Sequence, residues 1–487
     1  MELYQSMGFN ENPFNKYSAE EELKYLSEMY QKPTYYESLL SEISEGNSRY
    51  LLGERGIGKS ALMYYLISDL KKKQIFAILI DEFDGIPIKN NGCQILCLTE
   101  EKIITELGID LLCDKSRLKR LDKYEREKLA FLINLFFESL GRSKFEKLYE
   151  KVSCTQRRNF FKKIYNKFVI RTINMILSGA SNVIGSTICK SMGLPILENS
   201  TVYQEFLSES SVVSDQIDKN KIDYATMKNI LKETASIINK LGYKKLVVFF
   251  DKIDEYAKLK SNIDSIALFL ENISTDTSLI YSDEFGIEFI LWNKLKDKLK
   301  EKQVRFDKAK PIDISWTHEE IKSIINKRLQ YFSDYKINSL REIVSEGLED
   351  ELIAMANGSP RQIIMLLSKI YEQQARIDSK ARMFCLQAVN EGKNKYCQNF
   401  EYELFFPNSE IKQSVNRILK VNKLEFEISE LARVTKKSVV TAGNWVRGMK
   451  GYGLVKEDDG RTGRAKVYVV SDPKLVYLIT NGLEYIG

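Results

Sequence analysis

The chain has 487 residues, of which 44% are hydrophobic and 29% are charged, and its formal net charge is +6. This length and composition predict a soluble, globular protein of about three domains. The mild positive charge permits contact with nucleic acid but does not argue for it, because Lys and Arg are nearly balanced by Asp and Glu. The seven cysteines form no C-x-x-C pair and His318 is the single histidine, which argues against a Cys/His zinc site. We expect reduced, buried thiols in a cytoplasmic protein.

Two segments bear on export and membranes. The N-terminal stretch MELYQSMGFNENPF lacks the basic and apolar regions of a secretory signal. Residues 172–189 (TINMILSGASNVIGSTIC) carry no charge and are barely numerous enough to span a bilayer. Because they include Asn, Ser, Thr and Gly, we favour a small-residue helix packed inside the protein. Membrane association is the alternative. Because we favour the packed helix, a membrane partner is not expected.

Short apolar runs alternate with helical patterns through much of the chain. The predicted strands are Arg49–Leu52, Ile75–Asp81, Lys245–Phe250, Gly286–Trp292 and Pro311–Ser315. The helices predicted near the first three strands are Tyr35–Ile43, Ser60–Leu70 and Asp218–Leu241. Continuous apolar runs without helical periodicity are typical of buried strands. Strands that alternate with helices predict an α/β fold with a parallel sheet.

Residues 100–215 depart from this alternation. They have a helical, strongly charged pattern with basic clusters at Lys115–Arg126, Arg142–Lys151 and Arg157–Lys167. We predict a helical, basic insertion here. The pattern is also helical from His318 to Cys397.

A complete phosphate-loop motif lies near the N-terminus. Residues 53–60 (GERGIGKS) match G-x-x-x-x-G-K-[ST], follow a predicted strand and open a predicted helix. The glycines let the backbone wrap phosphates with its N–H groups, and the helix N-terminus faces the same place. Lys59 can neutralise phosphate charge and Ser60 can hold Mg²⁺. The predicted ATP- or GTP-binding residues are Gly53, Gly56, Ile57, Gly58, Lys59, Ser60 and Ala61.

A second motif, LVVFFDKIDEY, begins at Leu246. Asp251 ends the apolar strand, where α/β sheets place ligand-binding residues, and its carboxylate can hold Mg²⁺. Asp254 and Glu255 follow within one turn, and one of them is expected to polarise the attacking water, with Glu255 favoured. The alternative for these two is a pair of solvated acids at a helix start, which the helix dipole also favours.

Three further residues suit a nucleotide switch. Asn293 ends the fourth strand, where it could contact the γ-phosphate or the water. Arg305 lies between the fourth and fifth strands, where it could reach the nucleotide of a neighbouring subunit. Arg361 opens a helix in the sequence GSPR. An arginine supplied in cis or in trans stabilises transition-state charge on phosphate. An ordinary surface contact is the alternative for all three.

Together these motifs resemble the extended AAA+ class, and within it origin-recognition-type initiators and the signalling STAND ATPases. The opening FNENPF (residues 9–14) is similar to the start of a bacterial P-loop ATPase group. The resemblance covers roughly residues 9–100 and 215–400. It implies the sheet order 5-1-4-3-2, a helical lid, Asn293 as sensor 1, Arg361 as sensor 2 and Arg305 as an arginine finger. Lys252 follows Asp251 where AAA+ proteins often have Glu, which suits a slow switch better than a motor.

The C-terminal pattern changes again. Helices are predicted at Ile411–Lys420, Glu427–Arg433 and Lys436–Met449, and strands at Leu454–Lys456 and Lys466–Val470. The segment resembles a winged helix, a family whose DNA-binding members place the third helix in the major groove. The candidate DNA contacts are Lys436, Lys437, Ser438, Thr441, Asn444, Arg447, Arg461, Arg464 and Lys466. Contact with protein is the alternative.

The domain organisation we expect follows from these patterns. Residues 1–99 and 216–316 would form the AAA+-like core, 100–215 the insertion, 317–405 the lid and 406–487 the winged helix. We expect an ATP-binding and ATP-hydrolysing switch that uses Mg²⁺, forms a homo-oligomer and binds duplex DNA in a nucleotide-dependent manner. The alternative is a STAND-like signalling ATPase in antiphage defence, whose insertion or winged helix contacts an effector protein. Salt-dependent binding of duplex DNA would favour the first.

Overall fold

The computed structural model describes residues 2–136, 189, 192–194, 222–407, 409–458 and 466–487. Several features singled out from the sequence lie outside these residues: the basic clusters 142–151 and 157–167, residues 172–188 of the uncharged stretch, and the candidate DNA contacts Arg461 and Arg464. Within the described part, no helix combines the length and the apolar character needed to cross a bilayer.

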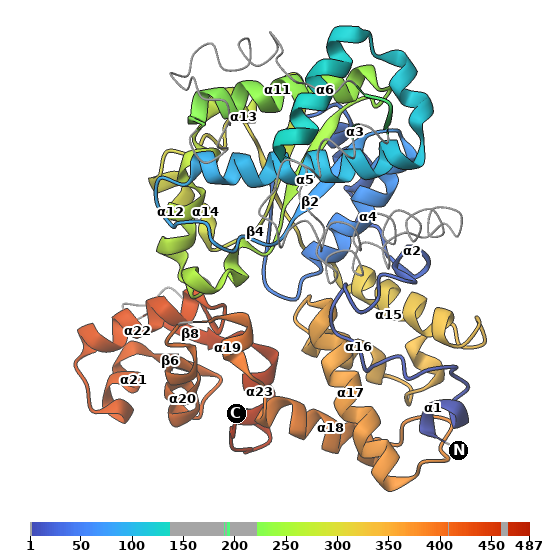
Figure 1. Cartoon of the computed structure of the whole chain (residues 1–487). Coiled ribbons are helices and arrows are strands. Elements are labelled where there is room, and N and C mark those ends of the chain that lie inside the picture. The colour runs from blue at the N-terminus through green and yellow to red at the C-terminus, as the bar shows by residue number, and fades with distance from the viewer. Residues whose placement is uncertain (1, 137–188, 190–191, 195–221, 408, 459–465) are drawn as a thin grey trace, which may run out of the picture.

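A five-stranded parallel sheet forms the centre of the molecule (Figure 1). Its strands are β1 (Arg49–Gly53), β2 (Phe76–Ile80), β3 (Leu246–Phe250), β4 (Phe285–Trp292) and β5 (Pro311–Asp313). Their order is β2-β3-β4-β1-β5. This is the order 5-1-4-3-2 that the resemblance implies, read from the other edge. The five strands predicted from apolar runs are all present.

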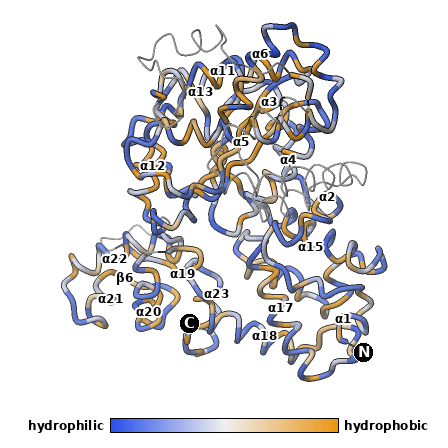
Figure 2. Tube along the Cα trace, viewed as in Figure 1, coloured by the Kyte–Doolittle hydropathy of each residue, from blue (hydrophilic) through white to orange (hydrophobic). Residues whose placement is uncertain are grey.

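Helices cover both faces of the sheet, so β2, β3 and β4 are buried on both sides. Leu51, Val247 and Phe249 point to one face and pack in a core with α3 (Tyr36–Ser44) and α4 (Lys59–Lys72). Leu52 and Val248 point to the other face. The helices there are α5 (Gly92–Cys113), α11 (Tyr224–Lys240), α12 (Ile263–Ser274) and α14 (Leu295–Glu301). In Figure 2 hydrophobic segments accordingly concentrate in the interior.

The predicted insertion begins within this helical layer. Helix α5 starts at Gly92, packs against β2 and α11, and runs through the expected boundary at residue 100. It is followed by the 3-10 helix η1 (Lys115–Arg120) and by α6 (Lys123–Phe136). In the basic cluster 115–126, Arg117 and Arg120 donate to the carbonyl of Leu241 at 3.3 and 3.4 Å. These two arginines therefore bind backbone rather than presenting free charge.

The helices that follow the sheet form a unit that we call the lid. They are α15 (His318–Phe332), η5 (Leu340–Glu342), α16 (Leu348–Met355), α17 (Pro360–Ile377) and α18 (Leu386–Gln398). The N-terminal segment, with α1 (Leu3–Ser6) and α2 (Leu26–Met29), packs on this lid (Figure 1). The backbone amide of Asn10 donates to the Phe332 carbonyl at 2.8 Å, and the Lys327 ammonium donates to the Tyr30 carbonyl at 3.1 Å.

The C-terminal region, residues 402–487, begins with α19 (Tyr402–Phe405). Its further helices are α20 (Ile411–Val421), α21 (Ile428–Thr435), α22 (Val439–Gly451) and α23 (Pro473–Thr480). The strands β6 (Glu425–Glu427), β7 (Val455–Glu457) and β8 (Val467–Val470) form an antiparallel sheet in the order β6-β8-β7. The three predicted helices and the two predicted strands are present. The strand β6 was not predicted, because its short EFE sequence has no apolar run.

Candidate functional site

The phosphate loop joins β1 to α4. Gly56 and Gly58 have φ values of +80° and +93°, in the left-handed region that glycine tolerates best. A Cβ at Gly56 would lie 3.1 Å from both Arg361 Cβ and Phe405 Cε1, so the lid and α19 close directly over this glycine. The Lys59 ammonium folds back into the loop and donates to the carbonyls of Gly53 and Glu54 at 3.1 and 2.9 Å. Burial lowers the pKa of Lys59, and the nearby carboxylates only partly oppose this effect.

Ser60 and Asp251 meet across the sheet edge. Ser60, in the first turn of α4, donates from Oγ to Asp251 Oδ2 at 2.8 Å. Asp251 follows β3, is only 3% exposed, and burial raises the pKa of its carboxyl to about 6. A hydroxyl beside a buried carboxylate is a donor set of hard oxygens, which suits Mg²⁺. The two residues predicted to hold the metal therefore lie together and fit it.

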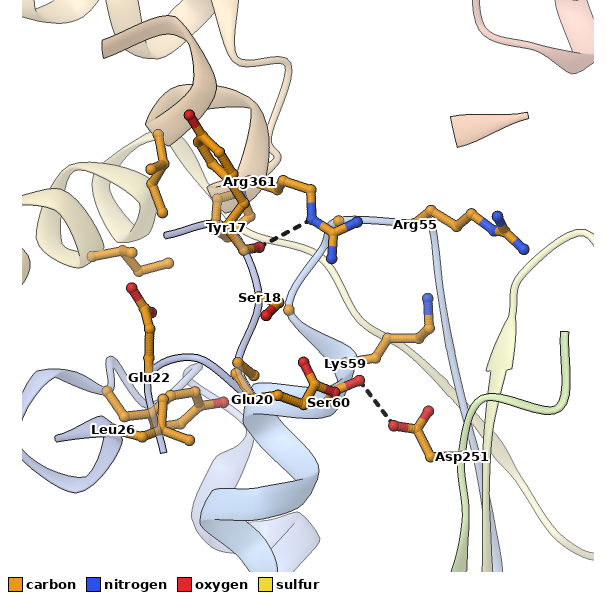
Figure 3. Close-up of a pocket in the computed structure, with 18 of the residues that line it drawn as sticks. Tyr17, Ser18, Glu20, Glu22, Leu26, Arg55, Lys59, Ser60, Asp251 and Arg361 are labelled. Carbon is orange, nitrogen blue, oxygen red and sulfur yellow. Dashed lines mark hydrogen bonds between the residues drawn. The ribbon is translucent and has the colours of Figure 1, made fainter. Parts of the chain in front are cut away.

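These groups line one cavity of about 360 Å³, within the usual range for ligand sites (Figure 3). Its walls come from the phosphate loop, the end of β3, the N-terminal segment and the lid helices α15 and α17. The lining residues predicted from the sequence are Gly56, Gly58, Lys59, Ser60, Ala61, Asp251, Asp254, Glu255 and Arg361. Gly53 and Ile57 belong to the same loop but do not line the cavity. The chain has the α/β fold of a P-loop ATPase with a helical lid.

The two acids predicted to polarise water lie in the 3-10 helix η3 (Ile253–Glu255), which leads through η4 (Ala257–Leu259) to α12. Asp254 Oδ2 accepts from Arg55 Nη2 at 2.6 Å and from Arg55 Nε at 3.0 Å. This ion pair engages one of the two oxygens of the Asp254 carboxylate. Glu255 is exposed at the rim of the cavity.

Arg361 joins the lid to the phosphate loop. Its backbone amide donates to the Gly56 carbonyl at 3.3 Å, and Ser359 Oγ donates to the same carbonyl at 3.2 Å. The Arg361 side chain enters the cavity and donates from Nε to the Tyr17 carbonyl at 3.2 Å (Figure 3). The start of α17 thus touches the loop that would surround the phosphates.

Asn293 and Arg305 do not line the cavity. The backbone amide of Asn293 donates to the Gly53 carbonyl at 3.2 Å. The side-chain oxygen of Asn293, Oδ1, is buried without a hydrogen-bond partner among the described residues. The Arg305 side chain is 56% exposed and pairs with Asp307 of its own loop at 2.8 Å. The sensor role of Asn293 and the finger role of Arg305 stay predictions.

The structure adds residues that the sequence did not reveal. Trp316 Nε1 donates to the carbonyl of Ile57 at 2.7 Å and so holds the phosphate loop. Lys252, with a φ of +57°, extends its ammonium to Glu20 of the N-terminal segment at 2.7 Å. Glu20 belongs to no motif and lies far from Lys252 in the sequence, so no local signal could have predicted this contact.

The candidate DNA contacts cluster on α22 and the residues before it. Lys436, Lys437, Ser438, Asn444 and Arg447 are exposed, and Thr441 is half-buried. The Ser438 hydroxyl caps α22 by accepting from the Thr441 amide at 3.1 Å.

Two features of this surface were not expected. Val439 and Val440, which are 59% and 76% exposed, add an apolar pair beside the candidate contacts. Lys466 lies 2.5 Å from Glu457, so it is already paired across the hairpin.

Comparisons with known proteins add weak likenesses. No family model and no curated protein matches the chain. Among solved structures, the Aeropyrum pernix ORC1 protein in complex with DNA is 10% identical, with 94% of this chain and 96% of that chain covered and a TM-score of 0.36. The Aeropyrum pernix ORC2 protein in its ADP form is 11% identical, with 98% and 97% covered and a TM-score of 0.37. Drosophila ORC bound to DNA is 10% identical, with 98% and 90% covered and a TM-score of 0.31. The fold assignment therefore rests on the sheet order and phosphate loop of this chain.

Proposed function

We propose that this chain is an ATP-binding and ATP-hydrolysing switch that binds duplex DNA through its C-terminal region in a nucleotide-dependent manner. The observation that carries the proposal is the cavity where the phosphate loop, the Ser60–Asp251 pair and Arg361 of the lid meet. Nucleotide bound there would contact both the sheet and the lid. Its presence would therefore favour one lid position over others.

The chemistry follows from the side chains in the cavity. Phosphate oxygens would replace the Gly53 and Glu54 carbonyls as the partners of the Lys59 ammonium. Ser60 and Asp251 would hold Mg²⁺, which neutralises phosphate charge when bound. Arg361 would add a second positive charge, supplied from the lid. Because each contact depends on phosphates, the site would distinguish ATP from an empty state.

The lid and the C-terminal region share a buried polar network, which supports their movement as one body. Lys474 of α23 is 1% exposed, and its ammonium donates to Gln362 Oε1 at 3.0 Å and pairs with Asp472 at 3.0 Å. Tyr402 donates to Asp472 at 2.9 Å. Gln362 directly follows Arg361 on α17. The hydrogen bond from Lys474 to Gln362 crosses between the C-terminal region and the lid. Since leaving a buried ammonium without this partner is costly, a turn of the lid would carry the C-terminal region with it.

A second contact reaches the C-terminal region from the sheet edge. Lys294 follows Asn293, and its ammonium lies 4.0 Å from the Phe406 ring centre and 4.7 Å from the Tyr452 ring centre. The same ammonium donates to the Gly451 carbonyl at 3.2 Å. Burial lowers the pKa of Lys294 to about 8. This aromatic cage would hold the C-terminal region against the ATPase core until the lid moves.

The C-terminal region is proposed to be a winged helix that presents α22 to DNA. The order helix, strand, helix, helix and hairpin, with the strand order β6-β8-β7, supports this assignment. The exposed Lys436, Lys437 and Arg447 suit phosphates and base edges. The valines 439 and 440 suit thymine methyl groups.

A homo-oligomer is also proposed. Each subunit would have a core of residues 1–99 and 216–316, a helical insertion of residues 100–215, a lid of residues 317–405 and a winged helix of residues 406–487. Arg305 is exposed outside its own cavity, which supports a role in the nucleotide site of a neighbouring copy. The signalling alternative in antiphage defence would need a protein partner, and it becomes the preferred function if DNA binding is absent.

The DNA-binding surface is tested by replacing Lys437 and Arg447 with alanine together. We expect duplex affinity to fall by at least about tenfold and the salt dependence to weaken by about one released ion for each removed contact. Lys412→Ala, at an exposed lysine of α20, is the matched control and should keep both properties. An unchanged affinity and salt dependence in the double variant would show that α22 does not contact DNA.

A further inference from the structure

Five acidic residues line the cavity: Glu20, Glu22, Asp251, Asp254 and Glu255. Asp251 accepts from Ser60, and Asp254 is held by Arg55. Glu22, which is buried, pairs with Arg328 of α15. Glu255 lies exposed at the rim. Glu20 is half-buried in the lining of the cavity and pairs with Lys252.

Glu20 lies beside the metal-binding edge of the sheet. Its Oε1 is 2.7 Å from the ammonium of Lys252, the residue directly after Asp251. Tyr64 lies one helical turn after Ser60 on α4. Burial raises the pKa of Tyr64, and the charges of Glu20, Asp81 and Asp251 raise it further, so Glu20 and Asp251 both act on one side chain. Glu20 and Ser60 both line the cavity (Figure 3).

The lid fixes the N-terminal segment on both sides of Glu20. On one side, Tyr17 donates from its hydroxyl to Ser368 at 2.8 Å and accepts from Arg361 through its carbonyl at 3.2 Å. On the other side, Arg328 binds Glu22. Glu20 therefore reaches the end of β3 as part of a segment that follows the lid.

We propose that Glu20 is the catalytic carboxylate of ATP hydrolysis, delivered to the site by the lid-bound N-terminal segment and positioned by Lys252. The inference rests on the proposed ATPase function. Glu20 accepts a hydrogen bond from the attacking water and takes its proton. The water oxygen forms the new bond to the γ-phosphorus, while the bond to the β–γ bridging oxygen breaks and its electron pair leaves with ADP. The products are ADP and inorganic phosphate.

The positive charge of Lys252 keeps Glu20 in its ionised form. Burial alone would raise the pKa of Glu20, but the hydrogen bond and positive charge of Lys252 bring it below its usual range. Glu20 is thus ionised at neutral pH and can orient a water molecule through its oxygens. Because the lid carries this carboxylate, an open lid would bind ATP without hydrolysing it.

The decisive variant is Glu20→Gln, compared with the matched control Glu28→Gln on the same segment. ATP affinity and single-turnover hydrolysis are measured separately on the full chain. We expect hydrolysis by Glu20→Gln to slow by about 100-fold or more, as for other general bases. ATP affinity should stay within about threefold of the wild type, which also shows that the variant folds. Glu28 is exposed outside the cavity, so its variant should hydrolyse normally.

A charge reversal separates the positioning role from simple loss of charge. Glu20→Lys should lose hydrolysis, and the double variant Glu20→Lys/Lys252→Glu should regain at least about tenfold, because it restores both the ion pair and a carboxylate at the site. Full turnover by Glu20→Gln, or loss confined to Glu255→Gln, would overturn the inference and leave the ATPase function intact. A wild-type chain that binds ATP without turnover would contradict hydrolysis and this inference together.

Discussion

Lys59 and Asp251 show how the site is prepared for a charged ligand. Burial lowers the pKa of the lysine and raises that of the carboxyl to about 6, so burial opposes the charged form of each group. A phosphate group would stabilise the positive charge of Lys59, and a divalent cation would stabilise the negative charge of Asp251. Both groups would therefore gain from binding of a nucleotide with its metal.

This electrostatic state predicts a pH dependence of binding. Because the pKa of Asp251 is raised, a proton occupies its carboxyl below about pH 6, and Mg²⁺ must displace that proton. The affinity for ATP with Mg²⁺ should therefore fall as pH falls through about 6, approaching tenfold for each pH unit below it. Fluorescence titrations between about pH 5 and 7.5 would measure it. The Asp251→Asn variant is the control, because its pH dependence reports only the protonation of ATP itself. Equal slopes of ATP affinity against pH in the wild type and in this variant would contradict the account.

At the scale of elements, local patterns predicted most of the sheet. Continuous apolar runs marked β2, β3 and β4, and the glycine pattern placed the phosphate loop, because each signal is confined to a few consecutive residues. The start of α5 at Gly92 was missed because apolar helical segments continue from the sheet layer into the expected insertion. The strand β6 is stabilised by pairing with β8 and not by its own composition.

The candidate site was predictable only in part. Lys59, Ser60 and Asp251 follow from motifs, and the structure places them together. Glu20 could not be predicted, because its position depends on packing of the N-terminal segment on the lid. The engagement of Asp254 by Arg55 also depends on the tertiary fold, since Arg55 lies in the phosphate loop and Asp254 in η3.

The aromatic cage around Lys294 gives a prediction for the link between elements. A cation over an aromatic ring contributes about 0.5–2 kcal/mol. Lys294→Met would remove this interaction and the hydrogen bond to Gly451 without touching the cavity. We expect ATP affinity to stay within about threefold, while the difference between DNA affinities measured with ATP and without nucleotide becomes smaller.

Lys300→Met is the matched control for this prediction, because Lys300 lies on the exposed side of α14. DNA binding by the two variants would be compared by fluorescence anisotropy with and without ATP. A nucleotide effect of unchanged size in Lys294→Met would show that the cage does not couple the sheet edge to the C-terminal region.

At the scale of the whole molecule, the cavity lies between two bodies. One is the sheet with its flanking helices, and the other combines the N-terminal segment, the lid and the C-terminal region (Figure 1). The Lys474 network joins the lid to the C-terminal region. The cavity lies between this body and the sheet, and the Lys294 cage connects the two. A nucleotide that binds more tightly in one relative position of the two bodies shifts the population of molecules toward that position.

The central claim is that the nucleotide state controls DNA binding, and one titration tests it most directly. Duplex DNA affinity is measured with ATP, with ADP and without nucleotide, at about 50 and 200 mM salt, for the wild type and Lys59→Ala. The account predicts salt-sensitive binding that ATP changes by about 5- to 150-fold in the wild type, and one affinity in all three conditions for Lys59→Ala. A wild-type DNA affinity that does not change with nucleotide, or that stays weak in every condition, would contradict the claim.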